Sequence, residues 1–153
     1  MTFNLTSSAF EPSATIPRQY TCDGADQSPP LAWITPPEPT RSLALIVEDP
    51  DAPGSTFVHW VIFNLPPGVS AFAAGVVKQT VLPDGTRQGR NDFRRVGYGG
   101  PCPPRGEEHR YFFRLYALDT LLDVTPGASA SELRSAMKGH VVGQSELMGT
   151  YGR

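Results

Sequence analysis

The sequence predicts a mainly β protein, an antiparallel β-sandwich with one short helix late in the chain. Three long apolar segments have strand character, and only one segment carries a helix start signal. The chain also holds 16 prolines and 15 glycines in 153 residues, spread from end to end, while charged residues make up only 18%. Such a chain favours many turns and short strands over long helices. Its length and the lack of a linker predict a single domain, residues 1–153.

The first two predicted strands are consecutive in the chain. Residues 41–49 are apolar on both alternating faces, which is typical of a strand buried on both sides, and the strand ends at Asp49-Pro50 because proline cannot donate to a sheet. Residues 56–65 follow after a short loop. If the two strands are antiparallel neighbours, Asp49 and His59 lie at the same rim. Alternation predicts one face with Phe57, His59, Val61 and Phe63 and the other with Val58, Trp60 and Ile62.

A third strong strand is predicted at residues 109–118, directly after a loop rich in glycine and proline. His109 opens this strand and is therefore expected at the same rim, on one face with Tyr111, Phe113 and Leu115. Weaker strands are predicted at residues 3–5, 17–21, 31–33, 75–79 and 141–147.

The single predicted helix begins at Ser129. Ser129-Ala-Ser-Glu132 has the pattern of a capping box, in which each side chain bonds the backbone of the other residue. Leu133, Ala136 and Met137 then form an apolar stripe, and Gly139 is a typical stop. His140, just beyond, is expected to be a surface histidine or one that interacts with the helix dipole.

Charge and hydropathy exclude several classes of partner. A net charge of −2 gives no reason to expect nucleic acid or an anionic membrane surface. No run approaches the ~18 apolar residues of a membrane span, and the start of the chain lacks the features of a signal peptide. We therefore expect a cytoplasmic protein without stable membrane insertion. Cys22 and Cys102 are expected to be reduced thiols in that compartment, although the sequence leaves their pairing open.

Asp49, His59 and His109 are the candidate functional residues. Each has a structural alternative: Asp49 could start a turn, and either histidine could be a satisfied core residue. A carboxylate after an apolar strand is costly unless it is hydrogen-bonded, and an imidazole is a natural partner. Residues 97–106 contain four glycines and three prolines, so their amides could cradle an anion, or the loop could be a stiff connector. Residues 91–95 are expected to be a solvated hairpin tip, with a pocket rim or partner surface as the alternative.

An ordered set of motifs resembles the phosphatidylethanolamine-binding protein family, and within it the bacterial and archaeal branch similar to Raf-kinase inhibitors. The resemblance runs nearly end to end and implies a Greek-key-like β-sandwich with a small pocket at one end. It rests on these segments: Thr21-Cys-Asp-Gly24, Ser28-Pro-Pro-Leu31 with Trp33, Asp49-Pro-Asp-Ala-Pro53, Phe57-Val-His-Trp60, Asn91-Asp-Phe93, Gly99-Gly-Pro-Cys-Pro-Pro104, His109-Arg-Tyr111, Gly139-His140 and Gly149-Thr-Tyr-Gly-Arg153. The ligand-binding positions it implies are Asp49, Pro53, Phe57, His59, Gly99, Gly100, Pro101, Pro103, His109 and Tyr111.

The resemblance implies a non-catalytic binding or regulatory protein without a cofactor or metal. Its ligand would be a small anion or phosphorylated head group, and its partner a kinase or protease that it inhibits; a homodimer is an open alternative to a monomer. Two departures bear on this. Glu107 and Glu108 place two carboxylates beside the pocket, which repel phosphate. The sequence also ends at Arg153, without the C-terminal helix of animal members, so their lipid or kinase specificity is not carried over.

A second hypothesis is a hydrolase that uses His59 and His109 as general acid and base with Asp49, with or without a metal ion. The sequence has no Gly-x-Ser-x-Gly nucleophile elbow. A third hypothesis is a protein-interaction module that binds through the rim loops. This third reading is compatible with the first, because a pocket for anions can receive an acidic or phosphorylated side chain.

Overall fold

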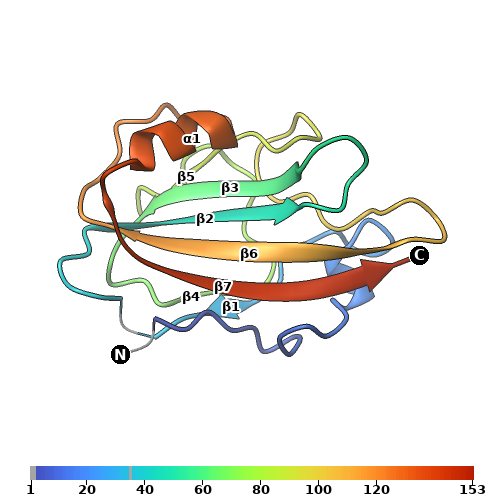
Figure 1. Ribbon diagram of the computed structural model, residues 1–153. Helices are drawn as coiled ribbons and strands as arrows, with labels where there is room; N and C mark the ends of the chain where they lie inside the picture. Colours follow the sequence, from blue (N-terminus) through green and yellow to red (C-terminus); the bar gives the residue numbers. More distant parts are fainter. Residues whose placement is uncertain (1–2, 35) are drawn as a thin grey trace.

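A computed structural model describes residues 3–34 and 36–153, and its centre is a five-stranded antiparallel sheet in the order β5-β3-β2-β6-β7 (Figure 1). A second, two-stranded sheet pairs β1 with β4. The elements are η1 (Arg18–Tyr20), β1 (Leu31–Ala32), β2 (Ser42–Asp49), β3 (Phe57–Leu65), β4 (Ala71–Phe72), β5 (Arg87–Gln88), β6 (Glu108–Leu118), α1 (Ala130–Met137) and β7 (Val141–Gly152).

The large sheet is covered on both faces. One hydrophobic core lies between it and the layer that contains β1, β4 and the N-terminal segment, and the other lies under α1 (Figure 1). Every residue of β2 is buried, because this strand is central in the sheet and both its faces are covered. The expected sandwich and the doubly buried strand are therefore confirmed.

The strongly patterned elements match their predictions. The three strong strands correspond to β2, β3 and β6, and α1 has both hydrogen bonds of the Ser129–Glu132 capping box. Of the weaker strands, 31–33 corresponds to β1, and 141–147 is the first part of a longer β7. The predictions at 3–5, 17–21 and 75–79 are wrong. Residues 17–21 contain the 3₁₀-helix η1, which follows Pro17, and residues 3–5 and 75–79 pair with no named strand.

A β-bulge in β3 overturns the predicted alternation of that strand. Val47 is opposite Trp60, but the next residue, Glu48, is opposite Val58, so His59 is the extra residue. Val58 consequently shares the α1 face with Val61 and Phe63, while the opposite core receives Trp60 and Ile62. The bulge turns His59 toward Tyr111, whose ring centroid lies 5.3 Å from that of His59.

Cys22 and Cys102 form a disulfide bond, so the expectation of reduced thiols is wrong. The bond joins positions 80 residues apart and links the segment after η1 to the loop that precedes β6. Within the described residues, no helix combines the length and apolar character needed to cross a membrane.

Candidate ligand-binding site

A cavity of about 210 Å³ lies where β2 ends and where β3 and β6 begin. Seven of the ten predicted positions are on its wall, which brings together all three residues at the expected rim. The wall comprises Asp49, Ala52, Pro53, Phe57, His59, Phe93, Cys102, Pro103, Pro104, His109 and Tyr111.

Asp49 is the buried carboxylate of the site, with only 3% of its surface exposed. Its Oδ2 atom accepts a hydrogen bond of 2.7 Å from Nδ1 of His109, and its Oδ1 atom accepts one of 2.8 Å from the amide of Asp51. The second bond is the Asx turn expected from Asp before Pro. Asp49 therefore serves both the turn and the histidine, and both its oxygens are satisfied.

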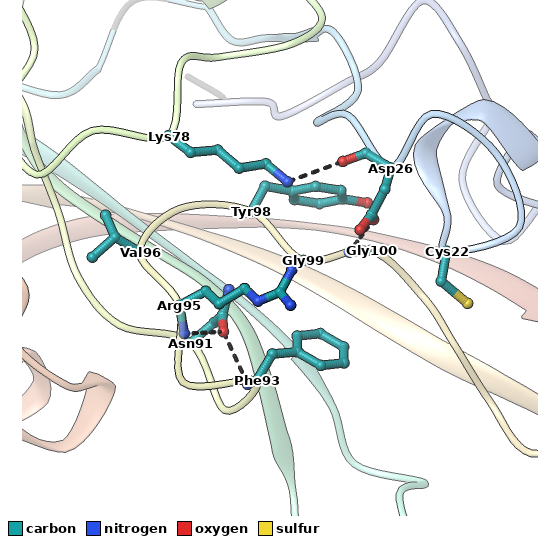
Figure 2. Close-up of a pocket in the computed structure, with 10 residues that line it drawn as sticks. All are labelled: Cys22, Asp26, Lys78, Asn91, Phe93, Arg95, Val96, Tyr98, Gly99 and Gly100. Atoms are coloured by element: carbon teal, nitrogen blue, oxygen red, sulfur yellow. Dashed lines mark hydrogen bonds between the residues drawn. The ribbon is translucent and has the colours of Figure 1, made fainter.

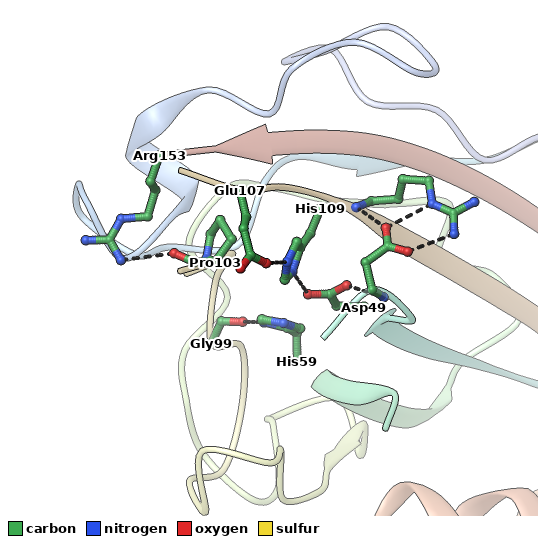
Figure 3. A network of polar contacts seen from close by, with 9 residues as sticks. Asp49, His59, Gly99, Pro103, Glu107, His109 and Arg153 are labelled. Carbon is green, nitrogen blue, oxygen red and sulfur yellow. Dashed lines mark hydrogen bonds and ion pairs between the residues drawn. The ribbon is translucent and has the colours of Figure 1, made fainter. Parts of the chain in front are cut away.

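His109 lies between two carboxylates (Figure 3). Nδ1 faces Asp49, and Nε2 is 2.8 Å from Oε1 of Glu107. Burial lowers the pKa of His109, but the hydrogen bonds to Glu107 and Asp49 raise it more, and the net shift is upward. Since a carboxylate only accepts, both ring nitrogens donate, and the structure favours an imidazolium at this position.

His59 has the opposite character. Its Nδ1 atom is 2.7 Å from the carbonyl oxygen of Gly99 and must donate, because a carbonyl only accepts. Burial among Phe57, Phe93 and Tyr111 lowers the pKa of His59, and the bond to Gly99 offsets only part of this effect. The neutral ring leaves Nε2 as an acceptor, and within the described chain this atom makes no hydrogen bond.

Tyr111 contributes a buried hydroxyl group to the same wall. Among the described residues, its Oη is the one fully buried side-chain oxygen or nitrogen that lacks a hydrogen-bond partner. Burial, and then the charge of Asp49, raise the pKa of Tyr111 well above its usual value, so the group remains a donor. An unpaired buried hydroxyl is unfavourable by about 1–3 kcal/mol, and a ligand or water at this end of the core would remove that cost.

The glycine loop differs from its prediction. The amide of Gly99 donates to the carbonyl of His59 at 2.9 Å, and that of Gly100 donates to Oδ1 of Asp26 at 2.8 Å. These two amides are thus committed within the fold and do not cradle an anion. Glycine is needed at position 100 for close packing, because a Cβ atom there would lie 2.3 Å from the carbonyl oxygen of Tyr20. Pro101 contributes to neither this cavity nor the next, and its carbonyl accepts from the amide of Cys22.

Four wall residues were not among the predicted positions: Ala52, Phe93, Cys102 and Pro104. Phe93 is the most informative of them. Its ring packs edge-on against Phe57 at 4.7 Å, and the Asn91 side chain fixes the turn that presents it. Residues 91–95 therefore form part of the pocket rim, and the expectation of a purely solvated hairpin tip is wrong. A lone aromatic residue in a polar tip was the available signal.

A second cavity of about 510 Å³ is lined by residues of the glycine loop and of the 91–95 turn (Figure 2). Gly99 and Gly100 lie on its wall, and Phe93 is shared by the two cavities. Lys78 crosses its upper side in Figure 2 and donates to the backbone oxygen of Asp26 at 3.2 Å.

Other charged residues near the strand ends have structural partners. Arg110 makes a two-pronged pair with Asp51, with both bonds at 2.9 Å. These bonds hold the pKa of Asp51 at about 2. His140 is a surface histidine paired with Asp119 at 2.8 Å.

Comparisons with known proteins agree with this architecture. A family model described as "Phosphatidylethanolamine-binding protein" matches residues 6–152. A UPF0098 protein of Methanothermobacter thermautotrophicus is 53% identical over 98% of this chain and 99% of its own length, and one of Aquifex aeolicus is 45% identical over 96% and 86%.

Two solved structures are also similar. A putative phosphatidylethanolamine-binding protein homologue of Chlamydia trachomatis has a TM-score of 0.90 and 41% identity, with 99% of this chain and 97% of that chain covered. Escherichia coli YbcL, described as a member of the mammalian family, has a TM-score of 0.91 and 34% identity, with coverage of 99% and 98%.

Proposed function

Because the chain belongs to the phosphatidylethanolamine-binding protein family, we propose that it is a non-catalytic binding protein whose pocket holds a small anion, such as phosphate or a phosphorylated head group. One observation carries the proposal: Nε2 of His109 already has a carboxylate oxygen at 2.8 Å. A ring position that holds one anionic oxygen suits another, and hydrogen bonds to charged groups contribute roughly 1.5–3 kcal/mol each.

The two histidines suggest which anion the pocket prefers. His109 offers an N–H donor with a positive charge, whereas neutral His59 offers an acceptor. A singly protonated phosphate can accept from the first and donate to the second. Sulfate carries no proton near neutral pH and cannot do both. The proposal therefore favours phosphate monoesters over sulfate.

NMR of the imidazole nitrogens tests the proposal. Titration with inorganic phosphate and phosphoethanolamine should shift the signals of His59 and His109 together, while those of the surface residue His140 stay fixed. Because His109 supplies the positive charge, His109→Ala should lose most of the phosphate affinity, at least tenfold. Unchanged affinity in that variant, or fixed His59 and His109 signals at millimolar ligand, would contradict the proposal.

The hydrolase hypothesis has one observation in its favour, namely that a neutral and a protonated histidine border one cavity, as in acid–base catalysis. A metal-dependent version fits less well, because His109 already uses both ring nitrogens. Within residues 3–34 and 36–153, no three His, Cys, Asp or Glu side chains are grouped for metal binding. Turnover of p-nitrophenyl phosphate or acetate that is lost in both His59→Asn and His109→Asn would replace the binding proposal with this one.

An inhibitory role would use the same pocket. An acidic or phosphorylated side chain of a kinase or protease would enter it, so pocket variants should lose the partner together with phosphate in a pull-down experiment. The cytoplasmic location and the homodimer remain predictions. The Cys22–Cys102 bond makes the location worth testing, since disulfides persist mainly in oxidising compartments.

A further inference from the structure

We infer that Glu107 is a tethered competing ligand of the pocket, whose carboxylate occupies the Nε2 position of His109 and must be displaced before an external anion binds. This inference rests on the proposed function and adds how the site is regulated and what it selects. The expected repulsion by Glu107 and Glu108 becomes, for Glu107, direct occupation of the site.

The two carboxylates on His109 are not equivalent (Figure 3). Asp49 is buried, and both its oxygens accept hydrogen bonds, so it has no room to leave. The Glu107 side chain is 53% exposed, and of its two oxygens only Oε1 makes a hydrogen bond within the described part of the chain. Asp49 is thus the fixed partner of the imidazolium, and Glu107 is the exchangeable one.

The backbone around Glu107 is held in place, so exchange requires only rotation of its side chain. The Glu107 amide donates to the carbonyl of Pro104 at 3.1 Å, and the Glu107 carbonyl accepts from the amide of Arg153 at 3.2 Å. Gly106, with a φ of 88°, donates to the carbonyl of Arg153 at 2.6 Å. This loop therefore keeps the carboxylate within reach of the ring at a high effective concentration.

Charge explains why occupation weakens binding. With Glu107 in place, His109 and its two carboxylates carry a net charge of −1, which repels an incoming anion. Once Glu107 swings out to solvent, Asp49 and His109 form a neutral pair with a free N–H donor. The apparent dissociation constant is the intrinsic one divided by the fraction of molecules in which Glu107 has left; if that fraction is about a tenth, the affinity is reduced about tenfold.

The competitor also sets selectivity. Acetate would only replace one carboxylate with another and must compete with a tethered group. Phosphate carries more oxygens and a proton, so it can reach His59 as well as His109. We therefore expect wild-type protein to bind inorganic phosphate and to discriminate against acetate.

The experiment is a phosphate titration of wild type, Glu107→Gln and Glu108→Gln, measured by calorimetry at about pH 6, where the raised pKa of His109 keeps its ring protonated. Glu108 is the matched control, since it is an adjacent exposed carboxylate and the two hydrogen bonds of the His109 ring in the described chain go to Asp49 and Glu107. We expect Glu107→Gln to bind phosphate about tenfold more tightly. Glu108→Gln, which removes a solvent-exposed charge, should change the affinity less than about twofold.

Phosphate affinity measured over a pH series separates the role of Glu107 from a general effect of removing a negative charge. In Glu107→Gln, the His109 ring loses a carboxylate charge that helps to raise its pKa, so its proton leaves at lower pH. The advantage of Glu107→Gln should therefore shrink as the pH rises above that of the calorimetry, whereas that of Glu108→Gln should not.

Each outcome has a separate meaning. Equal tightening in both variants, or no tightening in Glu107→Gln, overturns the inference and leaves the anion pocket intact. Absence of phosphate binding in all three proteins overturns the proposed function itself. Tightening confined to Glu107→Gln supports both.

Discussion

His59 and His109 are similarly shielded from solvent in one cavity, with 3% and 4% of their surfaces exposed, yet their environments shift their pKa values in opposite directions. His59 lies among aromatic rings and donates to a backbone carbonyl, which leaves burial as the dominant influence on its pKa. His109 has a carboxylate at each nitrogen, which outweighs its burial. The two rings therefore differ through their neighbours: carboxylates at both nitrogens raise the pKa of His109, whereas nothing comparable offsets the burial of His59. The same pair of rings can offer an acceptor and a charged donor to one ligand.

Removal of the charge on Asp49 should break this contrast most strongly. Asp49→Asn keeps the shape, but an amide has one accepting oxygen, while both Asp49 oxygens accept from N–H groups. One buried donor would lose its partner, and we expect the free energy of unfolding at about pH 6 to fall by about 3 kcal/mol. Urea denaturation would measure this, and NMR should show His109 titrating at lower pH.

The control is the exposed pair of the same residue types, Asp119 and His140. Asp119→Asn should cost less than about 1 kcal/mol, because solvent already screens that pair. If both variants lose the same stability, the buried pair has no special role in fixing His109.

The pH dependence of stability should show the contrast in wild-type protein. The pKa of folded His109 is raised, so its contribution is complete below the ordinary value of about 6.5 and is lost as the pH rises through the folded value. The pKa of folded His59 is lowered, so below about 6.5 the unfolded chain takes up a proton that the folded chain refuses, and stability falls as the pH decreases.

Single variants separate these two effects. His59→Asn should remove part of the loss on the acid side, and His109→Asn part of the loss on the alkaline side. The measurement is urea unfolding across the histidine range for wild type and both variants. Identical pH profiles in the two variants would show that the rings do not differ.

The sequence predicted that the two histidines lie together, because their placement depends on strand order. The apolar segment before Asp49, the short reversal to His59 and the loop before His109 were enough to place the three residues at one rim. The long apolar strands and the capping box were predictable because their patterns are local. The formation of the 3₁₀-helix η1 where a strand was predicted, at residues 17–21, was not predictable, since short segments take their structure from tertiary contacts.

The features that distinguish the two rings could not be predicted. The bulge at His59 depends on register with β2, and a one-residue change in register reverses which face a side chain occupies. The bond of His59 to Gly99, the commitment of the Gly99 and Gly100 amides, and the disulfide all join residues far apart in the chain. The position of Phe93 on the cavity wall likewise depends on a contact between distant residues, because its ring packs against Phe57. The turn that presents the ring is fixed by Asn91.

Tyr111 gives the smallest expected effect, and one whose sign is diagnostic. Its hydroxyl group is buried beside both histidines and has no hydrogen-bond partner among the residues that the structure describes, so Tyr111→Phe removes an unsatisfied group and should leave stability unchanged or raise it by up to about 1 kcal/mol. Tyr98→Phe is the control, because the equally buried Tyr98 hydroxyl donates to the carbonyl of Tyr20 at 2.7 Å and its loss should destabilise by about 1 kcal/mol.

If the Tyr111 hydroxyl is a donor kept for the ligand, Tyr111→Phe should also weaken phosphate binding about fivefold, the equivalent of one hydrogen bond, while Tyr98→Phe should not. Thermal unfolding and phosphate titration of the two variants would check both expectations. A Tyr111→Phe protein that loses stability but not affinity would mean that the hydroxyl serves the core, and the ligand contacts would then be confined to the two rings.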